Sequence, residues 1–296
     1  MNAPELGKSW SLTAPYFHAD WRTRDIDILH DTGHTGVVFC LREQHLASPD
    51  QLPAMADVVA HAKQLGMTTE LDLWSFGRVF GGEALTTYGP DNPACYESGS
   101  FTSLVRRGID AAAELGIDGM FWDEAHFKDC TDCEKTNELP LIEDGARYAY
   151  EQHGLENYVC LTSNPLNMGR LAILAAHNFI HRVETDPYFT NYPPDQPTLD
   201  VYVGKYSQTV ADIAKAHGIR SRIWVQGFQL ESGWEDIPLR AAATATSHGI
   251  HEIGFWACKN WHKANISVPV ETIRPINNDT VFSPSLSNAR PPVIID

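Results

Sequence analysis

One pattern recurs along the chain: an amphipathic stretch ends at a glycine, and a short apolar run follows within a few residues. A glycine in the left-handed conformation is a common helix C-cap, and a short apolar run suits a strand buried on both faces. Each instance therefore predicts a helix followed by a buried strand. The glycines concerned are Gly33, Gly66, Gly116, Gly154, Gly218 and Gly249.

Two further apolar segments, 11–17 (SLTAPYF) and 178–189 (NFIHRVETDPYF), bring the predicted strands to eight. Eight parallel strand–helix units within about 250 residues are typical of a closed (β/α)8 barrel. An open doubly wound sheet would call for a glycine-rich phosphate-binding turn, and neither GxGxxG nor GxxxxGK[ST] follows any predicted strand. We therefore predict an α/β fold, a single TIM-type barrel, with residues 120–124 ending the fourth strand and 183–186 ending the sixth.

The chain reads as one domain. Its 296 residues, 43% of them hydrophobic, can bury a large core, and no linker or low-complexity run divides them. We predict one domain over 1–296, with the barrel at about 10–262 and a proline-containing tail, 263–296, packed on the outside. The sequence leaves the oligomeric state open, although barrels with this much surface often form homodimers.

The charge balance limits the partners. The 22 basic and 38 acidic residues give a formal charge of −16, which repels nucleic acid and anionic lipid surfaces. No apolar run approaches the roughly 20 residues of a membrane span, and the opening MNAPELGKSW lacks the pattern of a signal peptide. The sequence therefore predicts a cytoplasmic protein that binds neither nucleic acid nor membrane.

Polar residues gather where the predicted strands end, which is where barrel enzymes carry their chemistry. The fourth strand closes on two adjacent acids, Asp123 and Glu124, and the sixth closes on Asp186; these three are the catalytic candidates. The substrate-binding candidates are Asp72, Trp74, Arg78, His126, Asn164, Glu184, Tyr188, Gln226, Lys259 and Trp261. Aromatic faces and hydrogen-bonding groups around acids suit a sugar, whose glycosidic bond two carboxylates can split without a cofactor.

Adjacent strand residues point to opposite sides, so Asp123 and Glu124 cannot both face the barrel axis while the strand is regular. The catalytic partner should therefore come from another strand, and Asp186 is the best-placed carboxylate. We predict Asp123 as the nucleophile or oriented base and Asp186 as the acid/base. In the alternative arrangement Glu124 is the acid.

Three segments, FWDEAHF (121–127), ETDPYF (184–189) and WVQGF (224–228), resemble strand ends of glycoside-hydrolase-like (β/α)8 proteins, and the likeness in architecture spans about 10–262. In retaining barrel glycosidases an Asn-Glu pair ends the fourth strand, its Glu being the acid/base, and a nucleophilic Glu ends the seventh. The resemblance matches Asp123-Glu124 to that pair, with Asp in place of Asn. Gln226 and Gln229 stand where the nucleophile should be.

A second group of barrels, similar to the α-galactosidases, carries a nucleophilic Asp at the end of the fourth strand and an acid/base Asp at the end of the sixth. Asp123 and Asp186 occupy those two positions. This resemblance implies the same catalytic pair, Asp123 and Asp186, as the alternating side-chain directions along the fourth strand. It identifies no particular family.

Structural explanations compete with several of these assignments. The acids of the fourth strand could cap the next helix or pair with Arg42 or Arg78. Glu184 lies deeper in its strand than Asp186 and could pair internally with Arg182 or Arg42. The cysteines Cys40, Cys160 and Cys258 lie in apolar segments predicted to be strands and should be core residues, like Trp122.

Three other cysteines fall in loops. Cys130 and Cys133 form a CxxC after the fourth strand, and Cys95 lies in the long loop after the third. With His126 or a carboxylate as fourth ligand they could hold a structural zinc ion. Free loop thiols are the competing interpretation.

Three classes of function follow. The first is a glycoside hydrolase or transglycosylase acting on an oligosaccharide or glycoside. The second is a metal-dependent barrel isomerase or hydrolase, whose ion would be held by Glu43, Asp72, Glu184 or His126; no HxH strand motif supports it. The third is a catalytically silent carbohydrate-binding barrel, which the glutamines of the seventh strand favour.

Overall fold

The computed structural model is a closed barrel of eight parallel strands, β1 to β8, paired in sequence order with β8 returning to β1. It describes residues 8–13, 23–31, 34–41, 45–46, 51–73, 99–123, 139–188, 195–226 and 236–256. The strands are β1 (Lys8–Thr13), β2 (Gly36–Cys40), β3 (Thr68–Asp72), β4 (Gly119–Asp123), β5 (Glu156–Thr162), β6 (Arg182–Asp186), β7 (Arg220–Gln226) and β8 (Glu252–Trp256).

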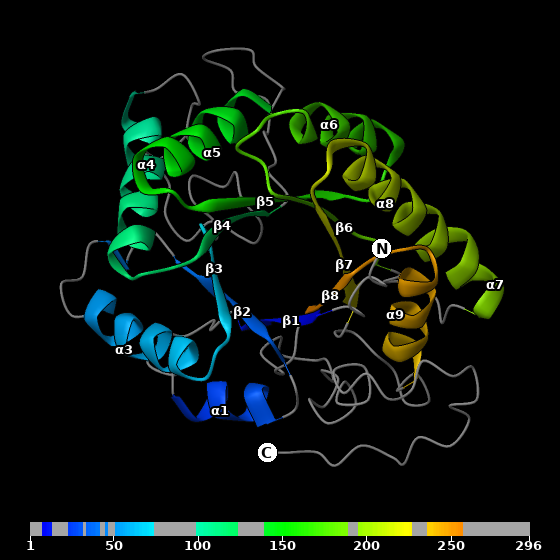
Figure 1. The fold of residues 1–296 in the computed structure, drawn as a ribbon, viewed down its shortest axis with the longest axis horizontal. Helices are drawn as coiled ribbons and strands as arrows, with labels where there is room; N and C mark the ends of the chain where they lie inside the picture. Colours follow the sequence, from blue (N-terminus) through cyan, green and yellow to red (C-terminus); the bar gives the residue numbers. More distant parts are fainter. Residues whose placement is uncertain are drawn as a thin grey trace, which may run out of the picture.

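Helices surround the strands on the outside (Figure 1). They are α1 (Thr23–Asp31), α3 (Gln51–Gln64), α4 (Gly99–Glu114), α5 (Leu139–His153), α6 (Pro165–Ala175), α7 (Gln196–Leu199), α8 (Lys205–His217) and α9 (Ile237–Ser247). A π-helical turn, η3 (Asp200–Gly204), joins α7 to α8. The predicted (β/α)8 barrel is therefore confirmed.

The glycines behave as the repeated pattern predicts. Gly66, Gly116, Gly154, Gly218 and Gly249 all have positive φ, between 68° and 85°, where a side chain would be strained. Gly218 is the C-cap of α8, and its amide donates to the carbonyl groups of the last helical turn. Gly33 lies outside the described residues. The helix-to-strand turns thus follow from local sequence alone.

The strand ends agree with the prediction where they can be compared. The fourth strand ends at Asp123, directly before Glu124, and the sixth ends at Asp186. The first strand begins at Lys8, three residues before the predicted segment, because β8 pairs with Lys8 to Ser11. The rest of the predicted first segment and the whole tail 263–296 lie outside the described residues, so the single-domain assignment to 1–296 stays a prediction.

The main hydrophobic core lies between the strands and the helices. Outward-facing strand residues such as Val37, Leu71, Val159 and Ile223 are fully buried against the helical layer. Trp122 also points outward, as a core residue: its indole donates to Asn157 Oδ1 at 2.9 Å. The strands whose side chains are described therefore present an apolar face to the helices and the opposite face to the barrel axis.

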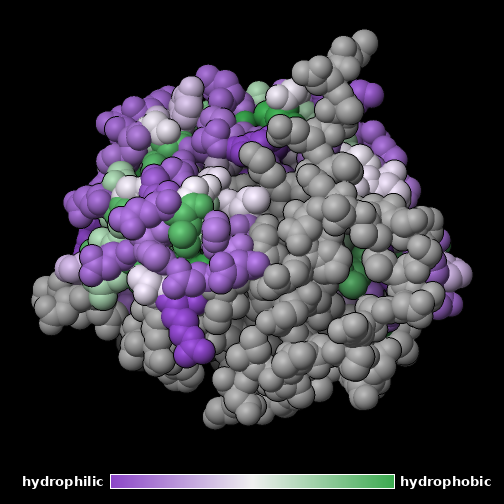
Figure 2. Space-filling view, turned by 60° about the horizontal axis from the view of Figure 1, so that its bottom comes forward, coloured by the Kyte–Doolittle hydropathy of each residue, from purple (hydrophilic) through white to green (hydrophobic). Residues whose placement is uncertain are grey.

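On the face shown in Figure 2, the surface of the described residues is largely hydrophilic. Exposed large hydrophobic side chains among the described residues are few, and Leu166, Ile173 and Val201 are the most exposed. None of the described helices combines the length and apolar character needed to cross a membrane.

Candidate active site

The side chains that face the barrel axis alternate along each strand. On β4 Trp122 faces the helices, whereas Phe121 belongs to an interior cluster, so Asp123 shares the inward parity of Phe121. The same rule places Asp72 inward on β3, since it pairs with the interior residue Cys40. It places Asp186 inward on β6, since Asp186 lies two residues after Glu184, which is hydrogen-bonded to Trp224 of the interior cluster. The carboxylate of the fourth strand that faces the axis is therefore Asp123.

Asp123 and Asp186 lie at the same level of the barrel. Asp123 pairs with Cys160 on β5, and Cys160 pairs with Glu184 on β6. In a barrel of eight strands with a shear of about eight, hydrogen-bonded partners descend by about one residue per strand along the axis. The residue of β6 level with Asp123 is thus two positions beyond Glu184, which is Asp186. Both acids stand at the carboxyl ends of their strands.

Asp186 and Gln226 are both buried at this end of the barrel, with Asp186 only 7% exposed. Asp123 is half-buried. Gln226 ends β7, pairs with Trp256 on β8, and is completely buried. A carboxylate pair and an inward amide at one end of the barrel can bind a polar ligand and exchange protons with it.

At this level and below it an apolar cluster fills the barrel. It consists of Val38, Cys40, Phe121, Tyr158, Cys160 and Trp224, with Tyr188 packed against it. The rings of Phe121 and Trp224 have centroids 5.2 Å apart. The ring of Trp224 fits only because position 254 is glycine, since a Cβ there would lie 2.5 Å from Cε3 of Trp224. Cys40 and Cys160 are thus core residues, as predicted.

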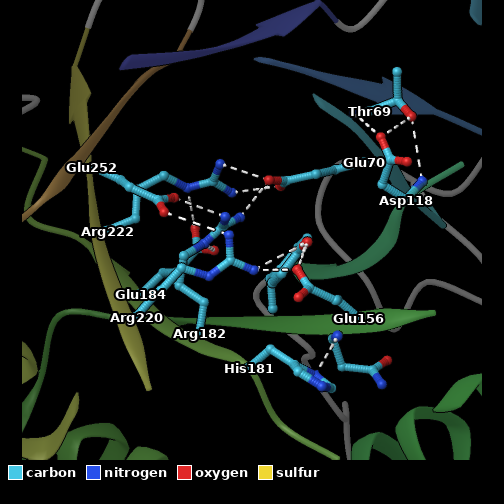
Figure 3. A network of polar contacts seen from close by, with 12 residues as sticks. Thr69, Glu70, Asp118, Glu156, His181, Arg182, Glu184, Arg220, Arg222 and Glu252 are labelled. Atoms are coloured by element: carbon cyan, nitrogen blue, oxygen red, sulfur yellow. Dashed lines mark hydrogen bonds and ion pairs between the residues drawn. The ribbon is translucent and has the colours of Figure 1, made fainter. Parts of the chain in front are cut away.

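The lower half of the barrel holds an ion-pair network, defined here as Glu70, Arg182, Glu184, Arg222 and Glu252 (Figure 3). Arg182 donates to Glu184 and Glu70 at 2.5 Å each and to Glu252 at 2.8 Å. Arg222 donates to Glu184 at 2.6 Å and to Glu70 at 2.8 and 3.2 Å. Each charged group of the network meets at least one group of opposite charge.

Glu184 belongs to this network. It accepts from Arg182, from Arg222 and, at 2.7 Å, from the indole of Trp224. Burial opposes the ionisation of Glu184, but the two guanidinium groups outweigh it and lower its pKa. The predicted internal pairing of Glu184 with Arg182 is confirmed.

Asp72 has a different environment from Glu70, which lies two residues earlier on the same strand. It is completely buried, and the thiol of Cys40 donates to its Oδ2 at 3.9 Å. Within the described part of the chain, Oδ1 of Asp72 has no hydrogen-bond partner. Burial raises the pKa of Asp72 well above its usual value, and the thiol contact opposes this only in part.

Asn164 is the N-cap of α6. Its Oδ1 accepts from the amide of Asn167 at 2.9 Å, and its amide group donates to Thr162 Oγ1 at 3.2 Å. The structure therefore gives this predicted ligand residue a local role at the helix start. Tyr188 is half-buried and contacts the interior apolar cluster from the loop after β6.

Other predicted site residues lie outside the described residues. They are Trp74, Arg78, Glu124, His126, Lys259, Trp261 and the three cysteines of the zinc prediction, Cys95, Cys130 and Cys133. The same holds for Arg42, Glu43, Gln229 and Cys258. Among the residues that the structure does describe, no group of three or more His, Cys, Asp or Glu side chains is arranged to hold a metal ion.

Three members of the network were not predicted from the sequence: Glu70, Arg222 and Glu252. Their signal was a period of two, since charges alternate with apolar or small residues in TTELD, RVETD and RSRIWVQ. That period shows that the charges share one face. It was overlooked because strands buried on both faces were expected to be apolar throughout.

No protein-family model matches the chain, and no curated protein matches it in sequence. Solved structures match it in fold. A GH5_18 protein from Bifidobacterium longum subsp. infantis aligns with a TM-score of 0.69 and 9% identity, over 92% of this chain and 79% of that one. GH26C from Muricauda sp. MAR_2010_75 aligns with a TM-score of 0.67 and 13% identity, over 93% and 86%.

A third match is a GH5_18 variant from Streptomyces cattleya, solved in complex with Manb1-4GlcNAc. Its TM-score is 0.62 at 12% identity, over 93% of this chain and 80% of that chain. At such identities the likeness shows the fold alone. The chain therefore has the (β/α)8 barrel fold that these glycoside hydrolases share, as the sequence resemblance implied.

Proposed function

We propose that the protein is a glycoside hydrolase, or a transglycosylase of the same chemistry, with Asp123 and Asp186 as its catalytic pair. The observation that carries the proposal is the position of these two carboxyl groups. They face the axis at one level of the barrel, at the end where barrel enzymes carry their active sites. The fold shared with glycoside hydrolases supports the same class of reaction.

In this proposal Asp186 protonates the departing glycosidic oxygen, and Asp123 attacks the anomeric carbon or activates a water molecule. Two carboxyl groups suffice for this step, and no cofactor is needed. Glu124 acts as the acid in the alternative arrangement. A strand that stayed regular past Asp123 would turn the next side chain away from the axis, so this arrangement requires a change of backbone direction after Asp123.

The substrate would be an oligosaccharide or a simple glycoside. Gln226 and Tyr188 would bind sugar hydroxyls and one sugar face, while Trp74, Arg78, His126, Lys259 and Trp261 would complete the cleft from its loops. The Manb1-4GlcNAc bound by the Streptomyces cattleya protein makes a β-mannoside the first substrate to try.

The test is an assay of the parent protein against aryl glycosides and oligosaccharides, including Manβ1-4GlcNAc, together with Asp123→Asn, Glu124→Gln and Asp186→Asn. Loss of one member of the pair should lower turnover by about 100-fold or more. Urea unfolding of each variant separates lost chemistry from lost structure. Near-parental turnover in both Asp variants would refute the pair.

A second candidate function is a carbohydrate-binding barrel without catalysis. The specific observation in its favour is Gln226, a neutral amide at the end of β7, where retaining barrel glycosidases carry their nucleophile. Calorimetric binding of sugars by a folded parent protein that cleaves none of them would favour this function. Cleavage would exclude it.

A further inference from the structure

Asp72 is an interior acid that the arginines of the ion-pair network do not neutralise. It lies one level below Asp123, because it pairs with Phe121, two residues before Asp123 on the neighbouring strand. On its other side it pairs with Cys40. Asp72 is therefore flanked, toward the carboxyl end of the barrel, by a thiol on β2 and a carboxyl group on β4.

The two oxygens of Asp72 differ in their partners. Oδ2 accepts from the Cys40 thiol on the β2 side, at 3.9 Å, which is a weak hydrogen bond. Oδ1 has no hydrogen-bond partner among the described residues, although it is buried. A buried carboxyl oxygen without a partner costs stability, and its presence at a strand end calls for an explanation.

The nearby arginines do not account for the buried carboxyl group of Asp72. Below Asp72, the Nε and both terminal nitrogens of Arg182 donate to Glu184, Glu252 and Glu70. The three nitrogens of Arg222 likewise donate to Glu184 and Glu70. Both guanidinium groups thus already face carboxylates of the layer below. Across the barrel, Cys160 and Trp224 present no charge.

A carboxyl group in such surroundings is stable as the neutral acid, and an acid O–H is a hydrogen-bond donor. On the β4 side, the next interior position above Asp72 is Asp123, whose side chain is half-buried. A carboxylate that accepts a hydrogen bond is stabilised in its charged form. A nucleophile or base must be in that form when the substrate binds.

We propose that Asp72 is a positioning residue for Asp123: it carries a proton and donates it in a hydrogen bond to the Asp123 carboxylate. The catalytic meaning of this bond depends on the proposed function of Asp123. The bond itself does not, because two neighbouring acids can share a proton in a protein of any activity. Asp72 thereby holds Asp123 in its ionised form.

The experiment titrates Asp72 and Asp123 separately by carbon NMR of the labelled carboxyl groups. Three proteins are compared: the parent, Asp72→Asn, which keeps a neutral donor of nearly the same shape, and Asp72→Leu, which removes the donor. We expect Asp72 to stay protonated through neutral pH in the parent. The titration midpoint of Asp123 should rise by about one pH unit in Asp72→Leu and stay near the parental value in Asp72→Asn.

A second arm uses stability and needs neither activity nor assignment of spectra. Asp72 is protonated in the folded protein and ionised in the unfolded chain above about pH 3.9. The folding equilibrium constant of the parent should therefore fall about tenfold for each pH unit above that value, relative to Asp72→Asn, until the folded group ionises. Asp57→Asn, at an exposed position on α3, is the matched control and should keep the parental slope.

Two results would overturn the proposal: ordinary acid titration of Asp72, or an Asp123 midpoint that is unchanged in Asp72→Leu. Failure of the proposed function looks different. A parent protein that cleaves no glycoside would refute the hydrolase assignment, while the NMR midpoints would still decide whether Asp72 donates to Asp123. In an active parent, the acid limb of the pH–rate profile should shift upward in Asp72→Leu and not in Asp72→Asn.

Discussion

The lower and upper halves of the barrel interior use the same residue type in opposite ways. On β3 Glu70 accepts three hydrogen bonds from two arginines, whereas for Asp72, two residues on, the described part of the chain supplies one donor, the thiol of Cys40. On β6 Glu184 is paired in the network, and Asp186 stands at the strand end above it. A buried acid with its counter-charge is a structural element, whereas an acid at the carboxyl end of its strand lies where barrel enzymes carry their chemistry.

The largest effect should come from breaking the lower half. Arg222→Met leaves the buried carboxylates of Glu184 and Glu70 short of a partner and should lower the free energy of unfolding by about 3–5 kcal/mol. Urea unfolding at pH 7 measures it. Arg220→Met is the control, because the Arg220 side chain is 40% exposed. Its ion pairs with Glu156 and, at 3.7 Å, with Glu252 should together contribute at most about 1 kcal/mol. Equal losses in both variants would contradict this view of the network.

The second prediction compares two acids of one strand. Glu184→Gln should cost about 2 kcal/mol of stability, since it weakens charge-assisted bonds from Arg182, Arg222 and Trp224. Asp186→Asn should cost less stability but should abolish most of any glycosidase turnover. Unfolding curves and rates measured on the same preparations separate the two. If Asp186→Asn proved the less stable variant and kept full turnover, the distinction between the halves would be lost.

The third prediction concerns the apolar cluster between the halves. Gly254→Ala would place a Cβ against the ring of Trp224 and should destabilise the protein by about 1–3 kcal/mol. Gly169→Ala is the matched control on the exposed face of α6, where a Cβ meets nothing within 4 Å. It should stabilise the protein by about 0.5–1 kcal/mol. Thermal melting of both variants gives the sign of each change.

The fold was predictable because its signals are local. Each left-handed glycine and the apolar run after it lie within a few residues, so Gly66, Gly116 and Gly218 mark helix ends without any knowledge of the rest of the chain. Repeating that unit leaves few topologies, and the barrel is one of them. The start of β1 was less accurate, because its extent depends on pairing with β8 at the far end of the sequence.

Which interior acids are paired with arginines was only partly predictable from the sequence. Strand parity assigns Glu184 and Asp186 to the same face, and the pairing of Glu184 with Arg182 could be anticipated from their spacing. The part played by Arg222 could not, since it lies 38 residues from Glu184 and 152 from Glu70. Which acids are neutralised depends on such distant partners. The catalytic roles of Asp123, Glu124 and Asp186 accordingly remain predictions.

The sequence separations within the network also bear on how the chain folds. Glu70 lies 112 residues from Arg182 and 152 from Arg222, so its counter-charges are made long after it during synthesis. A half barrel ending at β4 would hold Glu70 in its interior with neither arginine, a state that desolvation disfavours. Closure of the barrel and neutralisation of its centre should therefore occur together, late in folding. Contacts of such long range make that step slow and cooperative, and the first half of the chain is expected to stay open until the second half arrives.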